Sequence, residues 1–135
     1  MQAEMMSLQA ALVAAFAADT ALTTLIGADG VVDAPPKGRE APYVTIARHD
    51  CARRDGLDAP GTDHRLIFHA WAARASRKAA LEIAARLEAV AGAAALSGGG
   101  ISVTHRVAER CEAEIDLRTG RARAMLRIRF LVEPE

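Results

Sequence analysis

The hydrophobic pattern of the first part of the chain has the period of a helix. Leu8, Leu12 and Phe16 recur every four residues, which predicts an amphipathic helix that begins at Ser7 or at an earlier residue. Such a helix presents one apolar stripe to a protein core and exposes its opposite side to solvent.

A second, short helix is expected directly after the first. Asp19 is a typical N-cap residue, because its carboxylate accepts hydrogen bonds from the free N–H groups of a first helical turn. Apolar residues follow within 22–26, and Gly27 is a natural helix end.

The next part of the chain predicts strands. A short extended piece covers 31–33, and three prolines within 34–42 exclude a helix or a central strand, so that this segment is expected to be a loop. The β-branched segment 43–49 predicts a strand that continues as far as residue 53 or 54. After a polar loop over 55–63, which is expected to form a hairpin tip, segment 65–72 is apolar on both faces and predicts a strand that is central or covered on both sides.

A third helix is predicted from the N-cap Ser76 to about Ala91, with apolar residues on one face at the helical period. On its other face, Glu82 and Arg86 have the favourable i, i+4 spacing for an ion pair. The glycine run 98–100 is expected to be a flexible connection, because no phosphate-binding motif follows it.

The last part of the chain alternates with the period of a strand. Segments 101–115 and 121–133 predict two strands joined by a turn over 116–120. In the last strand the even positions from Ala122 to Val132 are apolar, whereas the odd positions are mostly arginine. The order α-α-β-β-β-α-β-β therefore predicts one α+β domain over residues 1–135, a mostly antiparallel β-sheet packed by the N-terminal helix and the central Ala-rich helix.

Composition limits the classes of protein that this chain can represent. It has 135 residues, 51% hydrophobic residues and a formal net charge of zero. The apolar content excludes disorder for most of the chain, and the neutral charge disfavours a generic nucleic-acid binder. No window approaches the ~20 apolar residues of a membrane span, and the first residues lack the basic region of a signal peptide, so we expect no membrane partner.

Histidine and cysteine spacing carries no metal or catalytic motif. We therefore expect no metal site. Cys51 and Cys111 are expected to be free thiols. The alternative of a small thiol-dependent enzyme would pair Cys51 or Cys111 with His105 as the base, although Cys111 falls on the apolar face of its strand, where a small buried thiol is ordinary.

Charged residues gather in two places and form the candidate interface. Arginines of the final hairpin share one face with Glu112 and Glu114, and a turn that sets Glu114 opposite Arg121 would set Glu112 opposite Arg123, leaving four arginines unpaired. This face is either solvated, or meets an acidic partner, or lines a channel through which DNA passes. The candidate interface residues are Asp50, Arg53, Arg54, Asp55, Asp58, Asp63, Arg106, Arg110, Arg121, Arg123, Arg127 and Arg129.

Several segments together resemble the tail terminator, or tail-completion, proteins of long-tailed phages, and above all the versions in phage-derived gene transfer agents. The resemblance covers nearly the whole chain. It is carried by the N-terminal helix that ends in Asp19-Thr20-Ala21-Leu22-Thr23-Thr24-Leu25-Ile26-Gly27, by Ala41-Pro42-Tyr43-Val44-Thr45-Ile46, by His64-Arg65-Leu66-Ile67-Phe68-His69-Ala70-Trp71, by the Ala-rich helix over 78–90 and by Arg127-Ile128-Arg129-Phe130-Leu131-Val132-Glu133.

This resemblance implies a structural protein without a catalytic site or cofactor. Members assemble as a hexameric ring at the head-proximal end of the tail tube, stop tube growth and join the tail to the head. The implied partners are further copies of the chain, the tail tube protein and the head–tail connector (stopper) protein, with at most non-specific contact with DNA in the ring. The implied location is the neck or tail of a phage-like particle assembled in the bacterial cytoplasm. Another connector ring, a stopper or an adaptor, is the alternative.

Overall fold

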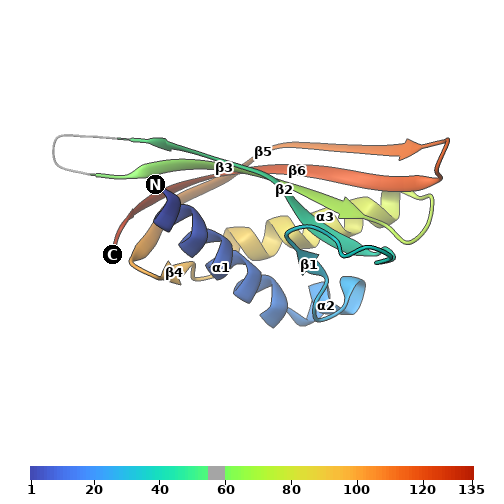
Figure 1. Ribbon diagram of the computed structural model, residues 1–135, viewed down its shortest axis with the longest axis horizontal. Coiled ribbons are helices and arrows are strands. Elements are labelled where there is room, and N and C mark those ends of the chain that lie inside the picture. Colours follow the sequence, from blue (N-terminus) through green and yellow to red (C-terminus); the bar gives the residue numbers. More distant parts are fainter. Residues whose placement is uncertain (55–59) are drawn as a thin grey trace.

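The protein folds as one twisted β-sheet with all helices on one of its faces (Figure 1). The computed structural model describes residues 1–54 and 60–135. Within these ranges the elements are α1 (Gln2–Ala18), α2 (Thr20–Ile26), β1 (Val31–Val32), β2 (Tyr43–Arg53), β3 (Thr62–Trp71), α3 (Arg77–Ala93), β4 (Ser97–Gly98), β5 (Ile101–Asp116) and β6 (Arg121–Pro134).

The sheet has the strand order β1-β2-β3-β6-β5-β4. Every neighbouring pair is antiparallel except β1 and β2, which are parallel. This arrangement confirms the predicted α+β class and the central position of β3, which lies between β2 and β6. The glycine run differs from the expected flexible connection: Ser97 and Gly98 pair with Ser102 and Ile101, because the positive φ angles of the glycines allow a tight turn there.

The core lies between the sheet and the helices. All even positions of β6 from Ala122 to Val132 are buried, as the alternation predicted. From α1, Leu8, Leu12 and Phe16 belong to the same core cluster, and the ring of Phe16 meets that of Phe68 edge to face at 5.7 Å. The predicted apolar stripe of the first helix is therefore confirmed, and the helix begins at Gln2.

Asp19 separates α1 from α2 and ties both to α3. Its side chain accepts a hydrogen bond from the N–H of Leu22, which confirms the predicted N-cap. The same carboxylate receives two hydrogen bonds from Arg86, at 2.7 Å from Nε and 2.6 Å from Nη2, and these lower the pKa of Asp19 to about 2. The expected pair of Arg86 with Glu82 is wrong. Arg86 pairs with Asp19 instead, because two parallel hydrogen bonds to one carboxylate are stronger than an exposed ion pair along the helix.

Within the described residues no single helix is long and apolar enough to cross a membrane. Only α1 and α2 taken together reach that length and composition, and they are bent by 87° relative to one another.

Phe16 provides a test of this core. Replacement by alanine is expected to lower the free energy of unfolding by about 3–5 kcal/mol, because it leaves a cavity between α1 and β3. Met6→Ala is the control on the same helix, since Met6 is 67% exposed, and a change of at most about 0.5 kcal/mol is expected. Urea unfolding measures both, and similar losses in the two variants would contradict the packing described.

Candidate interaction surface

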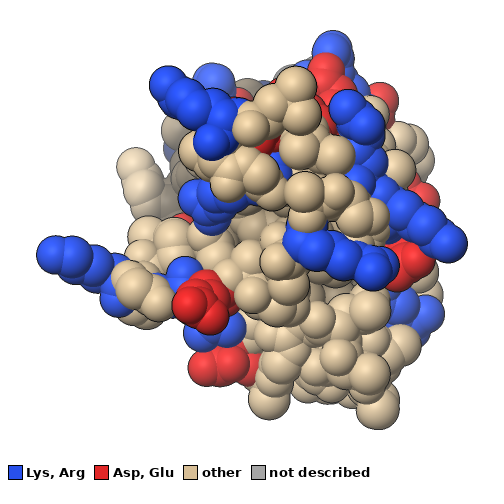
Figure 2. Space-filling view, turned by 90° about the vertical axis from the view of Figure 1, so that its right-hand side faces the viewer, with Lys and Arg blue, Asp and Glu red and all other residues tan. Residues whose placement is uncertain are grey.

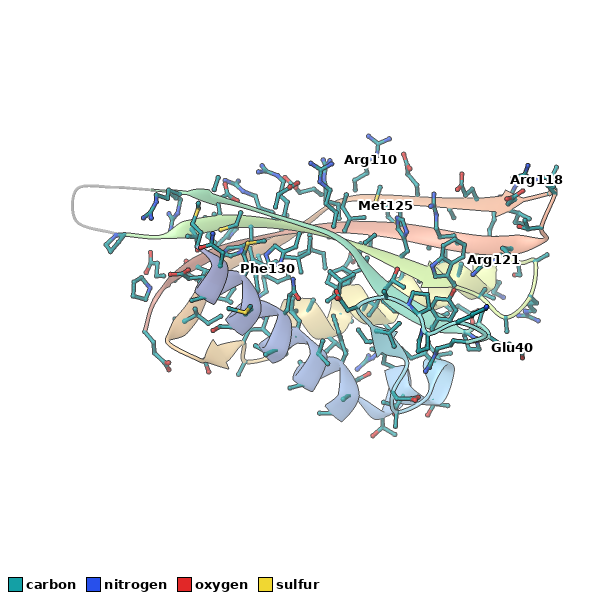
Figure 3. All side chains as sticks on the ribbon, viewed as in Figure 1. Glu40, Arg110, Arg118, Arg121, Met125 and Phe130 are labelled. Carbon is teal, nitrogen blue, oxygen red and sulfur yellow. The ribbon has the colours of Figure 1, made fainter. Side chains whose placement is uncertain are left out.

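The face of the sheet that carries no helix bears most of the candidate interface residues. Odd positions of β6 project from this open face, and Arg110 of β5 points away from the helical layer on the same side (Figure 3). Because the main apolar core lies on the other face, many of the side chains here interact through charge and hydrogen bonding.

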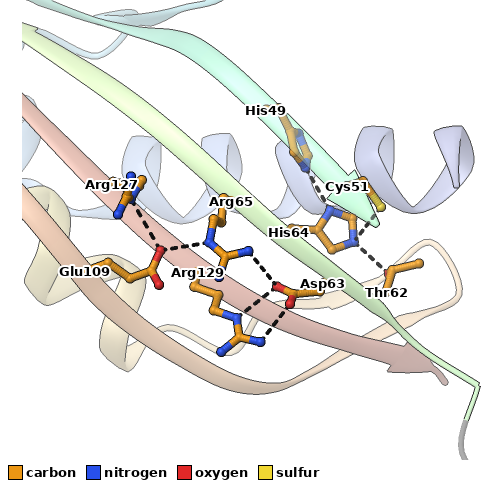
Figure 4. Close-up of polar contacts among 9 residues, drawn as sticks. All are labelled: His49, Cys51, Thr62, Asp63, His64, Arg65, Glu109, Arg127 and Arg129. Atoms are coloured by element: carbon orange, nitrogen blue, oxygen red, sulfur yellow. Dashed lines mark hydrogen bonds and ion pairs between the residues drawn. The ribbon is translucent and has the colours of Figure 1, made fainter. Parts of the chain in front are cut away.

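Five of these side chains form a continuous chain of ion pairs across β3, β5 and β6 (Figure 4). Glu109 accepts from Arg65 at 3.1 Å and lies 3.4 Å from Arg127. Asp63 accepts from Arg129 at 3.0 Å and 2.7 Å, and Arg65 lies 3.9 Å from it. The hydrogen bonds from Arg129 hold the pKa of Asp63 below its usual range. Arginines at the centre of this face are therefore paired with carboxylates of the same chain.

Nearer the hairpin turn, the register differs from the one expected. Arg121 lies opposite Asp116, and Arg123 lies opposite Glu114, to which it donates at 2.6 Å. Arg110 pairs with Glu112 along β5. The expected register is wrong by two residues, because the turn closes between Asp116 and Gly120 and so brings Asp116 into the ladder. The expected register left four arginines without partners in the hairpin. Most of these four have carboxylate partners on the same sheet face.

Arg106 does not belong to the open face. A bulge between Ala108 and Arg110 reverses the side-chain alternation of β5, so that Arg106 lies opposite the buried Phe130 and points toward the helices. There its Nη1 donates to the carbonyl oxygens of Ala91 and Ala94, at 2.8 Å and 2.6 Å. These acceptors lie at the C-terminal end of α3, where carbonyl groups lack helical partners. The placement of Arg106 with Arg110 on one face is therefore wrong, and Arg106 stabilises the end of a helix.

Arg121 has aromatic partners in place of a carboxylate. Its guanidinium carbon lies 4.2 Å from the centre of the Trp71 ring, and its Nη2 donates to the Tyr43 hydroxyl at 2.7 Å. Stacking on Trp71 and the hydrogen bond together fix the position of this cation near the hairpin end of the sheet.

The remaining predicted residues lie toward the other end of the sheet. Asp55 and Asp58 lie outside the described residues. Asp50 accepts from Arg48 at 2.9 Å, and Arg54 donates to Glu133 at 3.3 Å. Arg53 is exposed beside Glu4. Asp63 was expected in the loop, but it belongs to β3, which begins at Thr62.

A chain of hydrogen bonds inside the protein was not expected from the sequence, and Figure 4 shows its part from His49 to Thr62. Gln9 of α1 lies 2.9 Å from Nδ1 of His49, Nε2 of His49 lies 2.8 Å from Nδ1 of His64, and Nε2 of His64 lies 2.7 Å from the Thr62 hydroxyl. One direction satisfies every link: the Gln9 amide donates to His49, and each neutral histidine donates from Nε2 to the next acceptor. Burial lowers the pKa of His49 to about 4 and also lowers that of His64, in agreement with neutral rings.

Among the described residues, neither cysteine is activated as a nucleophile by a neighbouring base. Cys51 lies 3.6 Å from His64, and burial raises the pKa of its thiol, which disfavours the reactive thiolate. Cys111 is exposed, so its expected burial is wrong: its strand lies near the sheet edge, where β4 covers only the first two residues of β5. His105 pairs with Leu131 on the open face, whereas Cys111 lies opposite the buried Leu126. Both thiols are free, as expected.

Comparisons with known proteins span nearly the whole chain. A family model described as "Tail completion protein gp17" matches residues 10–133. Among solved structures, a chain of the "Virion of native gene transfer agent (GTA) particle" superposes with a TM-score of 0.79 at 28% sequence identity. That alignment covers 93% of this chain and 94% of the other. No curated protein matches the chain.

The histidine chain predicts a pH dependence of stability. Below about pH 6.5 the unfolded state binds protons at His49 and His64 that the folded state excludes, so stability falls as the pH drops from 6.5 toward 4. For the wild-type protein we expect the free energy of unfolding to fall by an amount on the order of 2 kcal/mol over this pH range. Urea unfolding at several pH values measures it. His49→Gln should flatten the profile, whereas His105→Gln, an exposed control, should keep the wild-type slope; equal slopes in all three proteins would contradict the assignment.

The ion-pair chain predicts unequal effects of two carboxylates. Asp63→Asn should lower the free energy of unfolding by about 1–2 kcal/mol, because Asp63 is mostly buried and accepts two charged hydrogen bonds. Glu114→Gln should change it far less, because the side chain of Glu114 is 65% exposed. Thermal or urea unfolding compares the two variants. A larger loss of stability for Glu114→Gln than for Asp63→Asn would argue against the ion-pair chain as the group that stabilises this face.

Proposed function

The chain belongs to the tail completion protein gp17 family, and we propose that it forms a hexameric ring that caps the head-proximal end of a tail tube and joins the tail to the head. This family consists of structural proteins of the virion rather than enzymes. The observation that carries the proposal is the family match over residues 10–133. It is supported by the shared fold with a chain of a gene transfer agent virion. The corresponding place for this chain is the tail region of a phage-like particle.

The charge distribution fits a subunit that meets copies of itself. Six subunits close into a ring through heterologous contacts, in which two different surfaces of the same chain meet. A formal net charge of zero avoids strong repulsion between neighbouring subunits. Because the arginines of the open face are largely paired with Asp63, Glu109 and Glu114, contact of this face with DNA in the ring would be weak and non-specific.

Particle assembly without the chain tests the proposal. We expect tail tubes of uncontrolled length and heads without tails, because nothing then stops tube growth or presents a joining surface. Adding the purified protein back should restore tubes of uniform length and their attachment to heads, with a six-fold ring at the tube end in electron micrographs. The double variant Cys51→Ala and Cys111→Ala should restore them equally.

Two results would oppose this proposal in different ways. Tubes of normal length that fail to join heads would identify a connector ring, a stopper or an adaptor, in place of a terminator. Normal tailed particles in the absence of the chain would exclude both roles.

A further inference from the structure

The turn between β5 and β6 presents a leucine to solvent. Leu117 is 90% exposed, which is more than any other large hydrophobic side chain among the described residues. The turn around it is closed by a hydrogen bond from the N–H of Gly120 to the carbonyl of Asp116 at 2.7 Å, and the Asp116 carboxylate accepts from the N–H of Arg118 at 3.0 Å. Gly120 has a φ of 71°, which an L-residue rarely adopts. The turn is thus a defined projection and Leu117 its apolar tip.

The surroundings of this tip are cationic. Arg118 and Arg121 flank it at the far end of the hairpin (Figure 3). Viewed from this end, Lys and Arg side chains outnumber the acidic ones on the surface (Figure 2). Among the residues described, Arg118 forms no ion pair, and Arg121 is bound only by the aromatic side chains beneath it. An apolar side chain with cations around it is suited to an apolar pocket with carboxylates at its rim.

The helical layer of the same molecule contains such a pocket. A hollow of about 320 Å³ lies between the second half of α1, the end of α2 and β1. This volume is at the lower end of the range for pockets that hold small ligands (~300–1,000 Å³) and is therefore ample for one leucine side chain. Its lining is mostly apolar and includes Val13, Phe16, Ala17, Ile26 and Val31.

One carboxylate belongs to the lining of this pocket, and a second lies one residue beyond the lining in the sequence. Asp29 is one of its lining residues, and its side chain is 86% exposed although it pairs with Arg39 at 3.3 Å. Asp33, also exposed, follows β1 directly. The pocket therefore has the polarity and the charge that complement the hairpin tip.

We propose that Leu117 of one subunit inserts into the pocket between α1, α2 and β1 of a second copy of this chain. Within one subunit the tip lies at the end of the β5–β6 hairpin, whereas the pocket lies in the helical layer beneath the sheet (Figure 1). Tip and pocket are different surfaces, so the contact is heterologous and can repeat around a closed ring. The inference rests on the proposed ring and names the contact that closes it, with Arg118 facing the carboxylates at the rim of the neighbouring pocket.

Cysteine cross-linking tests the contact directly. Leu117→Cys is combined with Ala17→Cys, at an exposed position of the pocket lining, in a Cys111→Ser background that removes the exposed native thiol. Oxidation of assembled rings, free or on tail tubes, should give a ladder of disulfide-linked species up to six subunits. The matched control replaces Ala17→Cys with Ala14→Cys, an exposed position of the same helix that is not part of the pocket lining. Rings that form but give no ladder, or an equal ladder from the control, would overturn the contact.

Substitution gives an independent measure. Leu117→Asp should raise the protein concentration needed for half-maximal ring formation at least tenfold, because it puts a charge in an apolar pocket that acids border. Leu117→Met should stay within about threefold of wild type, as expected for a small change in buried apolar volume. Thr119→Asp, in the same exposed turn, is the control for charge alone and should also have little effect. Analytical ultracentrifugation or native mass spectrometry measures assembly.

The remaining outcomes separate this inference from the proposed function. If Leu117→Asp forms rings as wild type does but these rings no longer bind tail tubes, the leucine contacts the tube protein and the contact between copies is wrong, while the ring stands. If the unmodified chain forms no ring, either free or on tubes, the proposed function fails and the contact fails with it.

Discussion

The fold depends on the burial of one face of the sheet only. Helices α1, α2 and α3 cover that face, and the alternating apolar residues of β6 fill the space between the layers. Hydrophobic burial is the dominant favourable contribution to folding. Because β6 lies in the centre of the sheet with one apolar face, its neighbouring strands must turn their apolar sides toward the same helical layer. The opposite face must then be stabilised without a second apolar layer. This protein does so with ion pairs between adjacent strands.

Irregularities in the strands decide which charges meet on that open face. The bulge at Glu109 turns Arg106 toward the end of α3, and it leaves the Glu109 carboxylate between Arg65 and Arg127. A regular strand would have placed Arg106 beside Arg110, as an unpartnered cation. The face is consequently close to neutral at its centre. At the hairpin end, Lys and Arg side chains outnumber the acidic ones on the surface that Figure 2 shows. This difference between surfaces suits the proposed contact between copies, since a heterologous contact requires surfaces that differ from one another.

Polar groups inside the protein connect the helical layer to the sheet. Asp19 joins the start of α2 to Arg86 of α3, and the Gln9–His49–His64–Thr62 chain joins α1 to β2 and β3. Each buried donor in these groups has an acceptor, which avoids the cost of an unsatisfied polar atom. They position the helices whose surface carries the apolar pocket, so the pocket's shape depends on the same contacts that stabilise the fold.

The sequence alone predicted the three helices, the long strands, the fold class and the family. Helical and strand periods are local properties, so the stripe of Leu8, Leu12 and Phe16, the caps Asp19 and Ser76, and the buried side of β6 could all be predicted. The tertiary structure decided the partners of the charged and polar side chains. A shift of two residues in the hairpin register and one bulge changed the partners of Arg106, Arg121 and Arg123, and only the pairing of β2 with β3 brought His49, Cys51 and His64 together. Such contacts depend on strand register. A bulge or a longer turn changes the register, and no single segment of the sequence specifies it, because it follows from how two distant segments pair.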